Sequence, residues 1–119
     1  MNAEAVAAIV LWFNDVSEEQ PFGPSVDVYK VAGKVFALID ADGTPPRVSV
    51  KCDPDLAIAL RAEYAAVIPG YHLNKKHWNT VLLDGSIPDD EIEEMLEHSY
   101  ERVVAGMPKA MRLRLGFRD

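Results

Sequence analysis

Three strand-like segments follow one another in the first half of the chain, joined by short turns. In "VDVYKVAGKVFALID" the pair Ala32-Gly33 separates residues 26–31 from residues 34–40, an arrangement typical of a β-hairpin. Asp42-Gly43, followed by two prolines, forms a second turn before "RVSVKC" at residues 47–52, where polar and apolar residues alternate with the period of a strand. Because short turns join antiparallel neighbours, this region predicts a three-stranded antiparallel meander.

A helix is expected before this meander. Residues 3–13 are alanine-rich, and Val6 and Ile9 lie at helical spacing. The segment contains Glu4 and no Lys or Arg, which favours an amphipathic helix over a secretory signal. Residues 17–25, "SEEQPFGPS", contain two prolines and a glycine, which predict a break between the helix and the first strand.

A second helix is expected over residues 53–64, "DPDLAIALRAEY". Asp53 is suited to cap its first turn, and Pro54 would occupy the first helical position, where a missing N–H costs nothing. The residues of this helix expected to face the core are Leu56, Ala57 and Leu60.

The third helix has the clearest sequence pattern. Ser86 and Asp89 form a loose capping box, and Pro88 falls in the expected first turn. The apolar stripe consists of Ile92, Met95, Leu96, Ser99 and Val103. The opposite, acidic stripe consists of Asp90, Glu93, Glu94, Glu97 and Glu101. Residues 106–108 end this helix, and residues 109–115 are expected to form one more helical piece.

The remaining apolar segment, residues 78–84, predicts a further strand that ends at Asp84-Gly85. Residues 67–68 are expected to add a short pairing segment before it. The length of 119 residues suits one domain, residues 1–119, with a single core. The resulting order, α-βββ-α-β(β)-α, predicts an α+β domain in which helices pack on one face of a mostly antiparallel sheet.

The charge balance counts against unspecific DNA binding. The chain has 12 Lys and Arg against 19 Asp and Glu, a net charge of −7. Proteins bind DNA non-specifically through basic side chains that release counterions, so an acidic chain needs a local basic patch. Residues 108–119 form a basic tail with Lys109, Arg112, Arg114 and Arg118 against Asp119 alone. This tail either contacts phosphate or pairs with the acidic body of the chain itself.

The single cysteine and the hydropathy indicate the compartment. Cys52 has no partner for an internal disulfide, and its alternation with polar residues places the thiol toward the core. No window approaches the ~18 uninterrupted apolar residues of a membrane span. We therefore expect a monomeric protein of the reducing cytoplasm, without membrane contact.

Catalytic and metal-binding patterns are weak. The sequence has no glycine-rich phosphate loop and no strand–turn–helix serine element, so we expect no catalytic residue and no cofactor. His72 and His77 are five residues apart, which fits neither a zinc-binding helix nor a usual finger. The carboxylates of the third helix could attract iron or calcium through their oxygens. An ordinary solvated helix face has the same pattern, and the carboxylates near its start suit the helix dipole.

Residues 69–85, "PGYHLNKKHWNTVLLDG", form the densest cluster of polar and aromatic residues. Lys75 and Lys76 are suited to phosphate contacts, and Asn74 to hydrogen bonds with base edges. The side chains suited to stacking on bases are Tyr71, His72, His77 and Trp78. The same residues also suit a structural role, with Trp78 in the core. The residues alone leave both interpretations open.

The segment "PGYHLNKKHWNTVLLDGSIPDDEIEEMLEHSYERVV", with "PFGPSVDVYKVAGKVFALI", "VSVKCDPDLAIALR" and "MPKAMR", closely resembles the MmcQ/YjbR family. The resemblance extends over residues 19–113 and implies a compact fold similar to that of frataxin (CyaY-like), also described as a double-wing DNA-binding motif. It further implies DNA as the ligand and no enzymatic activity. The positions carried over are Lys51, Tyr71, His72, Asn74, Lys75, Lys76, His77 and Trp78.

We therefore expect a small, non-enzymatic DNA-binding domain in which Lys51, Lys75 and Lys76 contact phosphates while aromatic or histidine rings stack. The alternative is a module that binds a protein partner or a metal ion through the acidic face of the third helix.

Overall fold

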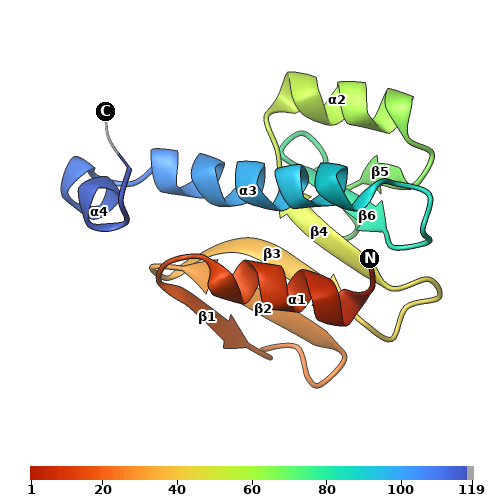
Figure 1. Cartoon of the computed structure of the whole chain (residues 1–119), viewed down its shortest axis with the longest axis horizontal. Coiled ribbons are helices and arrows are strands. Elements are labelled where there is room, and N and C mark those ends of the chain that lie inside the picture. Colours follow the sequence, from red (N-terminus) through yellow and green to blue (C-terminus); the bar gives the residue numbers. More distant parts are fainter. Residues whose placement is uncertain (118–119) are drawn as a thin grey trace.

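Six strands form one antiparallel sheet in the order β1-β2-β3-β4-β6-β5, and helices accompany it (Figure 1). The computed structural model describes residues 1–117. The strands are β1 (Val16–Glu19), β2 (Val26–Val31), β3 (Lys34–Asp40), β4 (Arg47–Lys51), β5 (Val67–Pro69) and β6 (Trp78–Leu82). The helices are α1 (Ala3–Trp12), α2 (Pro54–Glu63), α3 (Asp89–Ala105) and α4 (Lys109–Arg114). The expected α+β class is confirmed.

The predicted meander is present as β2, β3 and β4, each paired antiparallel with the next. Ala32 and Gly33 join the first two strands with φ of 46° and 85°, as a two-residue hairpin turn of the right twist requires. Strand β6 pairs with β4, and β5 pairs with β6. The short pairing segment expected at residues 67–68 is therefore confirmed.

The expected break over residues 17–25 is wrong in its first part, because β1 extends to Glu19 and pairs antiparallel with β2. Its four residues, "VSEE", show no apolar alternation. Three of the four are exposed, as suits a strand at the edge of a sheet. Alternating apolar residues mark a strand only where one of its faces is buried. Because little of β1 is buried, its sequence lacks that pattern.

One face of the sheet carries the core and the helices (Figure 1). Val48, Val81 and Val67 lie opposite one another across β4, β6 and β5, and each is at most 3% exposed. The apolar stripe of α3 packs onto this face, and all five of its predicted members are buried. The other side of α3 is strongly acidic. Within residues 1–117, no helix is both long and apolar enough to cross a bilayer.

The opposite face of the sheet has no helix from residues 1–117 packed on it. The register places Leu38, Ser49 and Thr80 opposite one another across β3, β4 and β6 on this side. Two pairs further along, and so on the same face, Lys51 of β4 lies opposite Trp78 of β6, and both are half-buried. We call this surface the open sheet face; it includes Val28, Lys30, Leu38, Asp40, Arg47, Ser49, Lys51, Trp78, Thr80 and Leu82, of which Val28, Ser49 and Thr80 are buried.

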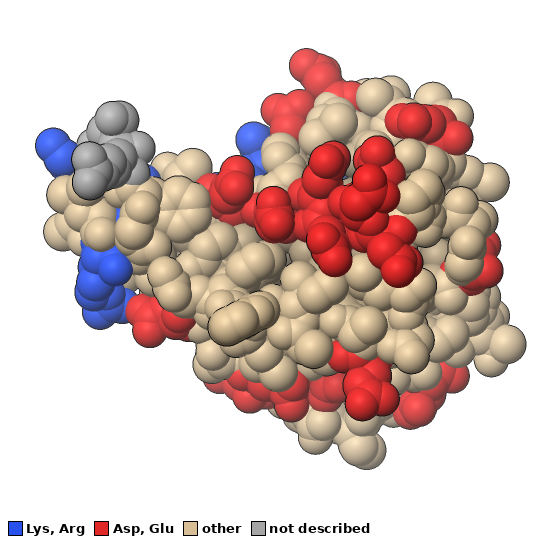
Figure 2. Space-filling model, in the orientation of Figure 1, with Lys and Arg blue, Asp and Glu red and all other residues tan. Residues whose placement is uncertain are grey.

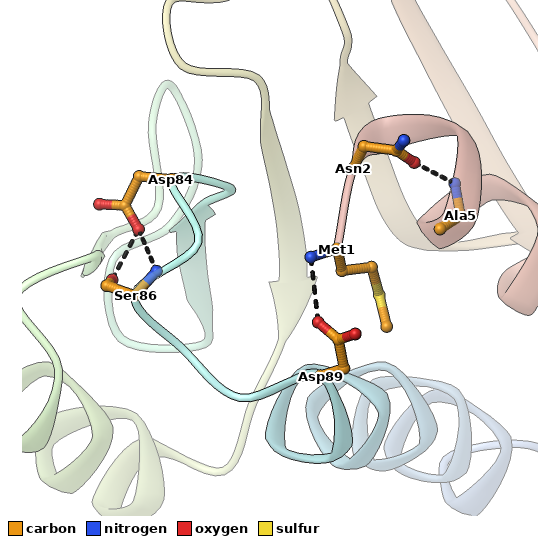
Figure 3. Close-up of polar contacts among 6 residues, drawn as sticks. All are labelled: Met1, Asn2, Ala5, Asp84, Ser86 and Asp89. Atoms are coloured by element: carbon orange, nitrogen blue, oxygen red, sulfur yellow. Dashed lines mark hydrogen bonds and ion pairs between the residues drawn. The ribbon is translucent and has the colours of Figure 1, made fainter.

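The helix termini are held by short-range polar contacts (Figure 3). Asn2 caps α1, since its Oδ1 accepts a hydrogen bond of 2.8 Å from the Ala5 N–H. The capping box expected for α3 is wrong, because the Ser86 N–H and hydroxyl both donate to Asp84, at 2.9 and 2.6 Å. Helix α3 instead begins at Asp89, whose carboxylate accepts from the Met1 ammonium group at 3.0 Å.

Helix α2 begins at the predicted position, but fewer of its side chains are buried than predicted. The Asp53 carboxylate accepts from the Leu56 and Asp55 N–H groups at 3.1 Å, and the Leu56 hydrogen bond foremost holds the pKa of Asp53 below its ordinary value. Ala57 is the buried residue of this helix, while Leu60 is half-buried. The expectation that Leu56 faces the core is wrong, since its side chain is 39% exposed.

Candidate nucleic-acid interface

The centre of the candidate site is the cross-strand pair of Lys51 and Trp78 on the open sheet face. Directly opposed residues in an antiparallel pair point to the same side of the sheet, so the ammonium group and the indole share one surface. The next pair of these two strands on the same face is Ser49 and Thr80, whose hydroxyl oxygens lie 2.8 Å apart. Two of the predicted contact residues are therefore brought together by strand register.

The loop of residues 70–77 contains the other predicted contact residues and is a series of tight turns. Asn74 Oδ1 accepts from the Lys76 and His77 N–H groups at 2.9 and 3.1 Å. The Asn74 side chain thus holds the turn through its acceptor oxygen, the role that Asn often has in loops. Gly70 is required where the loop begins, because a Cβ there would lie 2.8 Å from the Trp78 Cβ.

Tyr71 lies beside the open sheet face, anchored by its backbone. Its N–H donates to Thr80 Oγ1 at 2.9 Å, and its side chain is 47% exposed. The Arg47 guanidinium lies 4.0 Å from the centre of the Tyr71 ring, within the range of a cation–π contact. The centre of the His72 ring lies 4.0 Å from the centre of the Tyr71 ring. The structure thus brings two exposed rings, Tyr71 and His72, together with the half-buried Arg47 guanidinium.

The two loop lysines differ in their surroundings. Lys75 Nζ donates to the Gly70 carbonyl at 2.8 Å, so this ammonium group helps to close the loop. Lys76 is exposed, whereas His77 next to it is half-buried. The predicted site residues are therefore close in space, but Asn74 and Lys75 use polar atoms to build the loop itself.

Arg61 of α2 positions this loop, and the sequence analysis missed it. Its Nε donates to Asn79 Oδ1 at 2.7 Å, and its Nη2 donates to the Lys75 and Trp78 carbonyls, the latter at 3.4 Å. Asn79 is 1% exposed and also donates to the Ala57 carbonyl at 3.4 Å. The only signal in the sequence was that Arg61 is the single basic residue of an otherwise apolar and acidic helix.

A shallow hollow of about 540 Å³ adjoins Lys51 at the strand ends. His77 lines it as well, together with His98 and Arg102 of α3. His98 Nε2 accepts a hydrogen bond of 3.1 Å from the Asp53 N–H, and Arg102 lies 3.7 Å from the Asp53 carboxylate. The hollow therefore combines two predicted residues, Lys51 and His77, with Arg102, and Glu101 of α3 lines it as well, so its charge is mixed.

Charge differs between the two sides of the molecule. Figure 2, which views the helix side, shows carboxylates gathered over α3, where the five predicted acidic residues are all exposed. On the open sheet face, Lys30 pairs with Glu19 at 2.8 Å and Arg47 pairs with Asp40 at 3.1 Å. Lys51 has Trp78 rather than a carboxylate opposite it. The open sheet face is therefore far less acidic than the side that α3 covers.

The basic tail pairs with the body of the chain at two of its arginines. Arg114 forms an ion pair with Asp15, and the Arg112 Nη1 donates to the Met107 carbonyl at 2.6 Å. Arg118 and Asp119, which also belong to the predicted tail, lie outside the described residues. For Arg114, the interpretation as a partner of the acidic body is confirmed.

Replacing Glu91 with glutamine is expected to raise the midpoint of thermal unfolding at neutral pH. Burial, followed by the charges of Glu94, Asp90 and Glu63, raises the pKa of Glu91 above its ordinary value of 4.5. The folded state therefore binds the proton more strongly than the unfolded state, and stability falls as pH rises from 4.5 through the raised pKa. Thermal unfolding followed by circular dichroism at several pH values measures the effect.

The gain from Glu91→Gln should disappear below pH 4.5, where the carboxyl group is protonated in both states. Glu93→Gln is the matched control, because Glu93 is exposed on the same helix. An equal gain for both variants at neutral pH would contradict the local origin of the effect and point to the overall negative charge instead.

The comparisons with known proteins agree with this structure. The sequence model of the YjbR family matches residues 11–102. The chain is 42% identical to the protein YjbR of Escherichia coli K12 over 83 residues, which is 70% of each chain. It is 36% identical to YbdF of Escherichia coli O157:H7 over 89 residues, 75% of this chain and 73% of the relative.

Among solved structures, the crystal structure of the Deinococcus radiodurans protein DR2400, a DUF419 domain, superposes with a TM-score of 0.90 at 37% identity. The match covers 99% of this chain and 90% of the other. A Pseudomonas syringae protein superposes with a TM-score of 0.75 at 27% identity, covering 86% of this chain and 98% of the other. With a family model over residues 11–102 and relatives of this identity, the chain belongs to the YjbR family, as its sequence predicted.

Proposed function

We propose that this protein binds single-stranded DNA across the open sheet face. The observation that carries the proposal is the Lys51–Trp78 pair, which places a cation and an indole side by side on a sheet surface free of helices. The exposed Tyr71 ring extends the aromatic surface toward the loop. Proteins that bind single strands combine cations that follow the backbone with rings on which bases stack.

A single strand fits this surface better than a duplex does. Stacking on Tyr71 or Trp78 needs the flat face of an unpaired base, which a duplex hides within its stack. The aromatic residues lie on or beside strands, and no helix of residues 1–117 projects from the open sheet face into a groove. Lys51 and Lys76 are the proposed phosphate contacts.

The affinity is expected to be modest and steeply dependent on salt. The net charge of −7 repels a polyanion at long range, so binding depends on a few local contacts. Each phosphate contact contributes about −0.7 to the slope of log affinity against log salt for a single strand. The two proposed lysine contacts thus predict a slope of roughly −1.4.

Fluorescence anisotropy with a labelled single-stranded oligonucleotide, at salt from about 50 to about 200 mM, tests the proposal. Tyr71→Ala is expected to lower affinity about tenfold, because one stacking contact is lost. Lys51→Ala and Lys76→Ala should each lower affinity and reduce the salt slope by about 0.7.

Lys34→Ala is the control, since Lys34 is exposed at a hairpin turn and its strand position belongs to the other face of the sheet. An unlabelled duplex of the same sequence should compete poorly. Absence of binding at low salt, or an equal loss in the Lys34 variant, would contradict the proposal.

A further inference from the structure

Helix α2 stands apart from α3 and leaves a groove between the two helices. Ala57 is the one residue of α2 classed as buried. The groove has a volume of about 360 Å³, within the range of small-molecule sites. Its walls are apolar, with Leu56 and Leu60 of α2 on one side and Met95 of α3 on the other. Val50 of the sheet forms part of its floor.

The two ends of the groove differ in charge because α2 and α3 run in opposite directions. The start of α2 contacts the second half of α3, where His98 accepts from the Asp53 N–H. Lys51 and His98 line the groove at this end. The end of α2 lies near the start of α3, where the charge of Glu63 contributes to raising the pKa of Glu91. Glu63, Glu91 and Glu94 all line the groove.

We infer that this groove binds a small organic cation, namely a primary amine carried on an apolar alkyl or aryl body. The apolar walls would take up the body, and the carboxylates at one end would hold the ammonium group through charge-assisted hydrogen bonds. Lys51 at the opposite end disfavours a second cation there, so the groove selects a monoamine over a diamine.

The groove and the proposed DNA surface meet at Lys51, which lines one end of the groove, and otherwise use different residues. Val50, on the groove floor, belongs to the face that carries the core, whereas Trp78 lies on the open sheet face. Carboxylates at the groove would repel a phosphate, so the two sites need opposite chemistry. The amine test uses variants of Leu56, Glu91 and Glu94, none of which belongs to the proposed DNA surface, so failure of amine binding would leave the DNA proposal intact.

Titration with hexylamine, followed by calorimetry and by amide NMR shifts, tests the inference. Saturable binding is expected, with shifts in α2 and in the first half of α3. Hexanol, which lacks the charge, and hexamethylenediamine, which places a second cation near Lys51, should each bind about tenfold more weakly or worse. These three probes share a chain length and differ in charge.

The variant Glu91→Gln/Glu94→Gln removes two carboxylates of the groove and should weaken hexylamine binding by about tenfold or more. Glu93→Gln/Glu97→Gln is the matched control, because it removes the same charge from exposed positions of α3 that do not line the groove. Leu56→Ser should also weaken binding, and circular dichroism confirms that each variant is folded.

An equal loss in both double variants would overturn the inference, because it would show attraction to the acidic surface as a whole. Equal binding of hexanol would overturn it too, since the carboxylates would then have no role. Shifts confined to residues outside the groove, or no saturable binding of hexylamine, would overturn it as well.

Discussion

Replacing Ser99 with alanine is expected to lower the free energy of unfolding by about 2–4 kcal/mol, since two buried backbone groups would lose their partner. Ser99 is 0% exposed on α3. Its hydroxyl donates to the Phe36 carbonyl at 2.5 Å and accepts from the Lys51 N–H at 2.8 Å. One side chain of a helix thus bridges β3 and β4 just beyond Ala37 and Val50, where their pairing ends.

Urea unfolding measures this loss, and thermal unfolding should show a fall of roughly 10 °C in the midpoint. Ser17→Ala is the control, because Ser17 is exposed on the edge strand and its replacement should change stability by less than about 0.5 kcal/mol. A loss for Ser99→Ala as small as that of the control would mean that water or a shift of α3 replaces the bridge.

Ser99 also shows what the sequence could and could not predict about the fold. The helical period placed it on the buried stripe of α3, and that placement is confirmed. The two strands that its hydroxyl joins lie 48 and 63 positions away in sequence, so no local pattern could identify its partners. The same limit explains Leu56, whose position on α2 is helical but whose exposure depends on the distance to α3.

The edge strand β1 and the start of α3 were mispredicted for local reasons. Strand β1 is polar because little of it is buried, so the alternation that identifies a strand is absent. Ser86 had the right spacing for a capping box, but the nearer Asp84 carboxylate binds it first. Ser86 therefore forms hydrogen bonds within the turn that precedes α3 and does not cap the helix.

The part of the candidate site that is continuous in sequence could be predicted, but the residues that other segments contribute could not. Residues 71–78 are adjacent in sequence, so their concentration of lysines and rings was visible without a structure. The contribution of Lys51 depends on the pairing of β4 with β6, which joins strands separated by a whole helix. Arg47 and Arg61 also reach the loop from distant segments, and only the fold places them there.

Replacing Arg61 with methionine is expected to lower the free energy of unfolding by about 1–3 kcal/mol, since Asn79 Oδ1 would remain buried without its donor. The carbonyls of Lys75 and Trp78 would also lose a donor, so the loop of residues 70–77 should become more mobile. Faster amide hydrogen exchange at Lys76 and His77 would show this directly.

The double variant Arg61→Met/Asn79→Leu separates the stability of the core from the position of the loop. Replacing both partners of a buried hydrogen bond by apolar groups of similar shape is close to neutral, so part of the lost stability should return. The contacts of Arg61 with the loop carbonyls stay absent, so the exchange of the loop amides should stay fast. If Arg61 positions Lys76 and Trp78 for binding, Arg61→Met should lower the affinity for single-stranded DNA, and the double variant should show the same low affinity. Recovery of affinity together with stability would show instead that Arg61 acts only through the core.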